Sequence, residues 1–249
     1  MTERTYIVSD VHLGAVPAET ERAFLGFLAH VRERAGRLIL AGDLFDFWFE
    51  YGPVVIGRHY RVLSALAELV EADVDVLMVG GNHDAWGGRF LRERVGIRFH
   101  ADPVRTELAG RPALIAHGDG LGTGDLKYRA LKAVLRSRLA VAAFRALHPE
   151  IGHRLARAVS STETKTEPPD VTRGRARMIE AWAVDRLRED PALGWVVCGH
   201  AHLPAVREVE PGRFYLNAGD WVRHDSYIVV SPGETPRIRS WSHGSAADA

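Results

Sequence analysis

The sequence predicts an α/β protein whose strands lead into one shared site. Short, continuous apolar runs recur along the chain and are typical of strands that are buried on both faces of a sheet. Segments with helical apolar spacing lie between several of them, and each run ends directly in a polar motif. Because ligands of layered α/β sheets gather outside the carboxyl ends of the strands, these motifs are expected to meet. The runs cover residues 6–8, 38–41, 76–79, 113–116 and 195–198.

Periodicity and turn residues predict the remaining regular elements. Helices are expected over residues 19–34, 60–72 and 175–187. The carboxyl-terminal part changes character, because Pro211-Gly212 and Pro232-Gly233 mark turns between short apolar runs. The small, polar tail from Ser242 is expected to fray. Strands are expected over residues 206–209, 214–217, 227–231 and 237–241.

Residues 126–166 interrupt the alternation of strands and helices. They show no strand signal, and apolar residues at helical spacing predict two or more helices. The segment has nine basic residues and two acidic ones. A basic, amphipathic cap suits a substrate with an anionic head and an apolar tail, or contact with an anionic membrane surface. The alternative is a solvated helical face packed on the core. The apolar residues at helical spacing are Leu131, Val134, Leu135, Leu139, Phe144 and Leu147.

Composition limits the classes of function. A chain of 249 residues with 46% hydrophobic content can form a single domain over 1–249, with 126–166 inserted in it. Lys plus Arg equals Asp plus Glu at 32 each, so the total charge gives no reason to expect nucleic acid as a partner. No obligate protein partner is inferred either.

The cell compartment is predicted from cysteine usage and apolar runs. Cys198 is the single cysteine, which excludes an intramolecular disulfide. Because no charged and then apolar leader precedes the first strand, a cytoplasmic location is expected. The apolar runs are shorter than the roughly 20 residues that span a bilayer, so any membrane contact is expected to be peripheral.

The polar motifs supply a set of metal ligands. In order they are Asp10-Val11-His12, Gly42-Asp43-Leu44-Phe45-Asp46, Gly81-Asn82-His83-Asp84, His117-Gly118-Asp119 and Gly199-His200-Ala201-His202. Each motif alone is weak, since an Asp-x-His or Gly-Asn pair is also ordinary loop chemistry. All five after strand runs indicate two divalent ions side by side, as in a two-metal hydrolase. The candidate ligands are Asp10, His12, Asp43, Asn82, His117, His200 and His202.

The ligand types define the metals and their arrangement. Carboxylate, amide and imidazole groups suit Mn, Fe, Mg or Zn, and no thiolate takes part. Asp43 is expected to bridge the two ions, because a carboxylate can bind two cations at once. Asp10, His12 and His202 would complete the first site. Asn82, His117 and His200 would complete the second.

His83 is expected to act on the substrate. Two adjacent ions lower the pKa of a bound water, so the nucleophile would be hydroxide and no side chain is needed for attack. A protonated His83 would stabilise developing charge and protonate the leaving oxygen. Asp46 is expected to hydrogen-bond His83 and keep it protonated, and Asp84 is a second candidate for that role.

This motif set is similar to the signature of the calcineurin-like metallophosphoesterases, which implies a four-layer α-β-β-α sandwich with two mixed sheets. Within that superfamily the chain most resembles the UDP-2,3-diacylglucosamine diphosphatases of lipid A biosynthesis. Residues that follow three of the motifs carry this resemblance. Trp48 follows the Gly42 motif, Asp125 and Tyr128 follow the His117 motif, and Pro204 follows the Gly199 motif.

The resemblance implies a nucleotide-lipid substrate. Hydrolysis of UDP-2,3-diacylglucosamine would release UMP and 2,3-diacylglucosamine 1-phosphate, with Mn as the expected metal. The helical insertion would form a lid over the acyl chains, at the cytoplasmic face of the inner membrane. His83 departs from the best-known branch, which has arginine at that position. The alternatives are a soluble phosphodiesterase or phosphatase of nucleotides or small phosphoesters, and a non-catalytic scaffold. The implied substrate-binding residues are Asn82, His83, Asp125, Lys165 and His200, with Ser161 and Thr162 as weaker matches.

Overall fold

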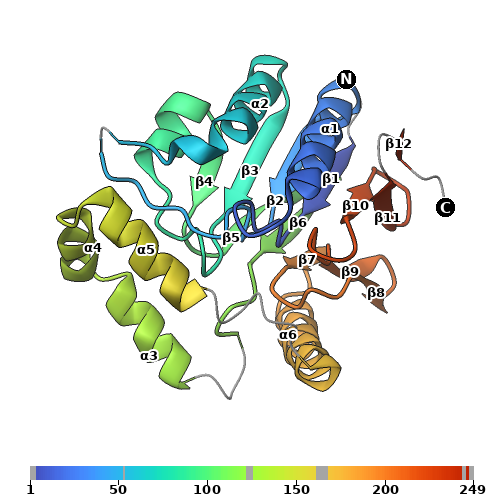
Figure 1. Ribbon diagram of the computed structural model, residues 1–249. Helices are drawn as coiled ribbons and strands as arrows, with labels where there is room; N and C mark the ends of the chain where they lie inside the picture. The colour runs from blue at the N-terminus through green and yellow to red at the C-terminus, as the bar shows by residue number, and fades with distance from the viewer. Residues whose placement is uncertain (1–3, 53, 122–125, 161–167, 243–244, 247–249) are drawn as a thin grey trace.

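The protein folds as two β-sheets that pack face to face between outer layers of helices (Figure 1). This computed structural model describes residues 4–52, 54–121, 126–160, 168–242 and 245–246. The expected α-β-β-α order of layers is confirmed.

The first sheet contains the amino-terminal parallel strands. β1 to β4 run parallel, and β10 pairs antiparallel with β1 at its other side. The strand order is β12 (Ser245–Ala246), β11 (Arg237–Ser242), β10 (Ser226–Val230), β1 (Thr5–Val8), β2 (Arg37–Leu40), β3 (Asp75–Val79) and β4 (Arg98–His100).

The second sheet has three parallel strands with an antiparallel strand at each edge. The strand order is β5 (Val104–Leu108), β6 (Arg111–Ile115), β7 (Trp195–Cys198), β9 (Arg213–Asn217) and β8 (Ala205–Glu210).

The core lies on both faces of each sheet. Successive side chains of a strand point to opposite faces, so strands covered on both faces must be continuously apolar. Ile7, Ile39 and Leu77 meet Ile115 and Val197 between the sheets.

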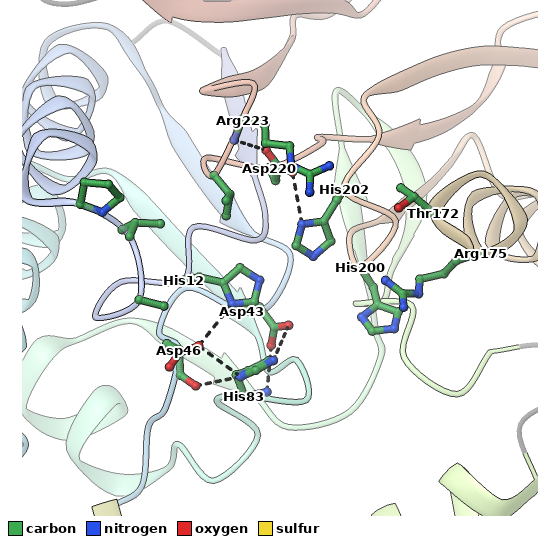
Figure 2. Close-up of a pocket in the computed structure, with 14 residues that line it drawn as sticks. His12, Asp43, Asp46, His83, Thr172, Arg175, His200, His202, Asp220 and Arg223 are labelled. Atoms are coloured by element: carbon green, nitrogen blue, oxygen red, sulfur yellow. Dashed lines mark hydrogen bonds and ion pairs between the residues drawn. The ribbon is translucent and has the colours of Figure 1, made fainter. Parts of the chain in front are cut away.

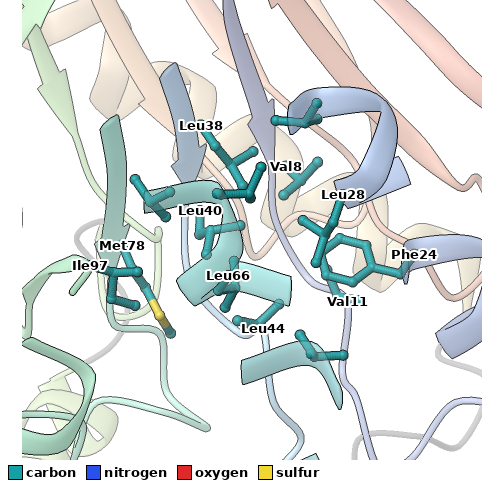
Figure 3. Packing of buried hydrophobic residues seen from close by; sticks show 14 of the residues in the cluster. Val8, Val11, Phe24, Leu28, Leu38, Leu40, Leu44, Leu66, Met78 and Ile97 are labelled. Carbon is teal, nitrogen blue, oxygen red and sulfur yellow. The ribbon is translucent and has the colours of Figure 1, made fainter. Parts of the chain in front are cut away.

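Helices cover the two outer faces. α1 (Ala18–Arg34) and α2 (Tyr60–Glu71) pack Phe24, Leu28 and Leu66 on the first sheet (Figure 3). α6 (Pro169–Glu189) packs on the second sheet.

The five predicted strand runs correspond to β1, β2, β3, β6 and β7, and the expected carboxyl-terminal strands are β8 to β11. α6 begins six residues before the predicted helix, at a proline in its first turn, where a missing N–H is tolerated. The expectation that the tail frays is wrong at Ser245 and Ala246, which pair with Ser242 and Trp241. The single-turn helices η1 (Gly57–His59) and η2 (Leu91–Val95) were not predicted.

The insertion forms α3 (Leu126–Leu135), α4 (Arg138–Arg145) and α5 (Pro149–Ser160). In Figure 1 these helices lie together, apart from α6. Phe144 of α4 packs on Phe49, with ring centroids 4.7 Å apart, and also contacts Phe47 and Tyr51. The insertion therefore docks on the loop that follows Asp43. That the chain is a single domain with residues 126–166 inserted in it remains a prediction.

Several apolar side chains of the insertion face solvent instead of packing on the core. Leu131, Val134, Leu135 and Leu139 are exposed, and Leu139 reaches 84%. Ile151 and Leu155 are exposed as well. Solvent therefore reaches a large apolar surface on α3, α4 and α5. Among the described helices, none is long and apolar enough to cross a membrane.

Candidate metal centre

The predicted ligands meet at the carboxyl ends of strands from both sheets. The backbone N–H groups of Asp10 and His12 donate to the carbonyls of Gly42 and Asp43 at 3.0 Å each. These bonds join the loop after β1 to the loop after β2. The N–H of Gly199 donates to the carbonyl of His117 at 2.7 Å, which joins the loops after β6 and β7 in the same way.

The backbone at this edge is strained where the ligands lie. Eight non-glycine residues of the described chain have a positive φ, and five of them are predicted ligands. Left-handed backbone costs energy for residues with a side chain, and it persists where surrounding bonds enforce it, commonly at functional sites. The five residues are Asp10, His12, Asp43, His200 and His202.

The glycines of the motifs allow close approach. A Cβ on Gly42, which has φ +95, would overlap the ring of His117. A Cβ on Gly81 would overlap the carboxylate of Asp43, and one on Gly199 would lie 2.7 Å from Asp10 Oδ2. These positions therefore exclude a side chain.

Asp43 lies between two groups of side chains. His202 Nε2 is 3.3 Å from Asp10 Oδ1, and His12 completes that group of potential ligands. His117 Nε2 is 3.1 Å from Asp43 Oδ2. His200 completes the second group, and Asp43 also belongs to a group with His12 and His83.

Asn82 joins the second group, since its Oδ1 lies 3.3 Å from His117 Nε2. All seven predicted ligands therefore converge, and Asp43 belongs to two of the groups of potential ligands.

The donor set fits divalent cations. Asp10 Oδ1 and both ring nitrogens of His12 are buried and have no hydrogen-bond partner among the described residues. Buried polar atoms without partners cost free energy, and such atoms in a native fold call for an explanation. A metal ion would satisfy these atoms, because carboxylate oxygens and imidazole nitrogens that converge on one point are typical metal ligands.

The pKa shifts of His12, His200 and Asp43 favour the forms that can bind a metal ion, whereas burial raises the pKa of Asp10 and nearby carboxylates raise those of His117 and His202. Burial lowers the pKa of His12 to about 3, so the ring is a neutral electron-pair donor. Burial and the nearby charges of His117 and Arg175 hold the pKa of His200 well below its usual range. Burial opposes ionisation of Asp43, but His117 and His83 hold the pKa of this carboxyl well below its usual range. Two neutral imidazoles and a carboxylate result.

Two histidines are oriented by their second ring nitrogen. His117 Nδ1 donates to the carbonyl of Ala41 at 2.9 Å, which leaves Nε2 facing Asp43. His202 Nδ1 bonds to Asp220 Oδ2 at 3.2 Å, which leaves Nε2 facing Asp10. Such outer partners fix the tautomer and the direction of a metal-binding imidazole.

Sequence reasoning missed Asp220. Burial raises the pKa of its carboxyl, but hydrogen bonds from His202 and from the backbone of Arg223 outweigh this effect and lower the pKa to about 2. Asp220 lies three residues beyond Asn217, the last residue of β9. A polar stretch at a strand end was the signal used for the other motifs, and it also applies here.

His83 is held differently from the prediction. Its Nδ1 donates to the main-chain carbonyl of Asp46 at 2.8 Å, whereas the carboxylate Oδ1 of Asp46 lies 3.8 Å away (Figure 2). Nε2 points toward Asp43 Oδ2 at 4.0 Å. The backbone of Asp46 therefore orients the ring, and Nε2 faces the cluster.

Asp84 does not hold His83, contrary to the second candidate assignment. Its carboxylate accepts the N–H groups of Leu44 and Gly81 at 2.7 Å each, and those of Asp43 and Phe45 at 3.3 Å. Burial and the charge of Asp43 raise the pKa of Asp84 to about 6. Asp84 therefore ties together the loops that carry Asp43 and Asn82.

Asp125, Lys165, Ser161 and Thr162 fall outside the described residues.

Tyr128 donates its hydroxyl to Asp119 at 2.9 Å, and Lys132 pairs with the same carboxylate at 2.6 Å. Asp119 therefore anchors α3 to the loop that carries His117.

A cavity opens over the cluster. Its floor contains proposed ligands together with His83 and Asp46. One side is formed by Thr172 and Arg175 of α6, and another by Val222 and Arg223 of the loop after β9.

Comparison with known proteins places the chain in a family. The family model described as calcineurin-like phosphoesterase matches residues 3–204. The chain belongs to the calcineurin-like phosphoesterase family. Membership, together with the clustered His and Asp side chains, makes the protein a metal-dependent phosphohydrolase and indicates a dimetal centre.

Curated relatives of this calcineurin-like phosphoesterase cover most of its length. A UDP-2,3-diacylglucosamine hydrolase of Porphyromonas gingivalis is 29% identical, over 92% of this chain and 94% of that protein. A UDP-2,3-diacylglucosamine hydrolase of Ectopseudomonas mendocina is 32% identical, over 90% of this chain and 93% of that protein. Among solved structures, a dimetal phosphatase from Danio rerio matches with a TM-score of 0.50 at 10% identity, over 96% of this chain and 99% of that one. The last similarity supports the fold alone.

Proposed function

We propose that the protein hydrolyses the diphosphate bond of UDP-2,3-diacylglucosamine to UMP and 2,3-diacylglucosamine 1-phosphate. The observation that carries the proposal is the likeness to curated hydrolases of this substrate along nine-tenths of the chain. The match therefore extends well beyond the short motifs that many phosphoesterases share.

The side chains of the cluster have distinct proposed roles. Asp10, His12 and His202 would hold one divalent ion, Asn82, His117 and His200 the other, with Asp43 shared. Two bound ions supply an activated water and neutralise charge on the phosphate. Mn is the proposed metal, with Fe, Zn or Mg as alternatives that use the same ligands.

His83 is proposed to protonate the leaving oxygen. Because Nδ1 donates to the Asp46 carbonyl, the ring is fixed with Nε2 toward the cluster. A proton on Nε2 can then be donated to a phosphate oxygen or to the leaving group during bond cleavage. Asn82 and His200, next to this position, are proposed to contact the same phosphoryl group.

The insertion is proposed to bind the acyl chains as a lid. Contiguous exposed apolar surface on a soluble protein commonly marks a binding site for a ligand or a membrane. Here Leu131, Val134 and Leu139 stand exposed on α3 and α4, while Arg138 and Arg145 are exposed on α4. Apolar and cationic groups on one element suit an acylated, anionic substrate at the cytoplasmic surface of a membrane.

The test is hydrolysis of UDP-2,3-diacylglucosamine in detergent micelles by the Mn-loaded protein, with products identified by mass. A generic aryl phosphodiester runs in parallel, and an Asp43→Ala variant controls for contaminating activity. UMP and the diacylglucosamine phosphate should form much faster than the aryl product. Turnover of the aryl ester alone would contradict the lipid substrate and favour a soluble phosphodiesterase.

A further inference from the structure

Two arginines flank the cavity over the cluster, and neither belongs to the motifs that predicted the site. Arg175 lies on α6, three residues after Thr172, so both side chains share one face of the helix. The next turn of α6 places Ile179 in the core against the second sheet. The packing of Ile179 thus fixes which face of α6 meets the cavity.

Arg175 stands beside the proposed ligands. Figure 2 shows its side chain reaching from α6 toward His200. A guanidinium next to a cation-binding centre is unfavourable unless an anion lies between them. The position is therefore suited to a negatively charged part of the substrate.

Arg223 approaches from another side. It follows Asp220 in the loop after β9, and its backbone N–H donates to Asp220 Oδ1 at 2.8 Å. The Asp220 carboxylate also bonds His202, so this loop is fixed to the cluster. Within the described part of the chain the Arg223 guanidinium has no hydrogen bond or ion pair, and its side chain lines the cavity.

We propose that Arg175 and Arg223 bind the phosphoryl group of a diphosphate substrate that is not attacked. This inference rests on the proposed function and deepens it, since one phosphoryl group would occupy the metal centre and the other would need its own cations. Guanidinium groups bind phosphate oxygens through paired, charge-assisted hydrogen bonds. The two arginines would thereby select diphosphate diesters over single phosphodiesters.

The experiment compares substrates with one and two phosphoryl groups. Wild type, Arg175→Gln, Arg175→Lys, Arg223→Gln and the double Gln variant are loaded with Mn, and bound metal is counted for each. Three substrates are compared: UDP-2,3-diacylglucosamine, UDP-glucose as a diphosphate without acyl chains, and bis(p-nitrophenyl) phosphate. UMP serves as the single-phosphate reference for binding. UDP-glucose is scored by KM if it is cleaved and otherwise by its inhibition constant against the aryl ester. Arg177→Gln is the matched control, because Arg177 is exposed on the same helix.

Removing one charge-assisted contact should lower kcat/KM for the diphosphate by about 10- to 100-fold. UDP-glucose should bind correspondingly more weakly, while metal content and aryl ester hydrolysis stay within about twofold of wild type. The Lys variant should recover part of the loss, and Arg177→Gln should behave as wild type.

Equal losses with all three compounds, or no loss with the diphosphates, would overturn the inference. Failure of wild type to cleave the lipid would refute only the proposed function, because UDP-glucose affinity still reads out the second phosphoryl group. Failure of wild type to bind UDP-glucose more tightly than UMP would overturn the inference as well.

Discussion

At the scale of single residues, the site combines side chains that the motifs mark with others that only the folded chain reveals. The seven proposed ligands could be predicted because each directly follows a strand. The partner of His83 could not, because a main-chain carbonyl carries no residue-specific signal. Arg175 could not be predicted either, since the packing of α6 decides which of its faces meets the cavity.

His83→Gln should leave metal binding intact and lower kcat by about 10²- to 10⁴-fold, the usual loss for a general acid. Asp46→Asn should cost far less, because the carbonyl that holds His83 remains. The measurement is steady-state kinetics with bound metal counted. A larger loss for Asp46→Asn than for His83→Gln would contradict this account of His83.

Asp220→Asn should weaken metal binding by about 10- to 100-fold, the range seen when an outer partner of a metal-binding histidine is removed. The physical reason is that the His202 ring loses the carboxylate that orients it. Metal affinity is measured by titration, with the exposed Asp170→Asn as control. Unchanged affinity would show that Asp220 is not needed to orient His202.

At the scale of elements, the central strands could be predicted more reliably than the edge strands and the contacts of the helix faces. Continuous apolar runs mark the central strands because both of their faces are covered. β4 and β5 were missed because they are short and partly polar. The exposed apolar face of α3 and α4 could not be told from a buried one, since periodicity shows that a helix has an apolar face and not what covers it.

Leu139→Ala should leave the free energy of unfolding within about 0.5 kcal/mol of wild type, since the side chain is 84% exposed. Phe144→Ala should weaken the docking of the insertion by about 3 kcal/mol of free energy, because the ring of Phe144 packs on the loop after Asp43. Denaturant unfolding and lipid KM are measured together. If the lid binds acyl chains, Leu139→Ala raises the lipid KM alone; an unchanged KM would contradict that role.

Cys198 of β7 should resist alkylation in the folded protein. It is fully buried in the second sheet, and burial raises the pKa of the thiol, so little thiolate is present at pH 8. Iodoacetamide treatment of native and unfolded protein, read by mass, checks this. Rapid modification of the native chain would show that the second sheet opens.

At the scale of the whole molecule, the two sheets bring residues from both ends of the chain to one edge. Asp10 and His200 are 190 residues apart, yet the N–H of His200 donates to Asp10 Oδ2 at 2.9 Å. The strained backbone of five proposed ligands is maintained by such bonds between loops. The family fold and the reaction class therefore follow from the same arrangement, and the substrate depends on what surrounds it.

Titration of the metal-free protein with Mn²⁺, with bound metal and rate of hydrolysis measured on the same samples, tests the dimetal account most directly. We expect no hydrolysis without metal, and a rate that reaches its maximum at about two ions per chain, because Asp43 is shared by two ligand groups. Full activity with one ion, or activity that survives complete removal of metal, would contradict the account.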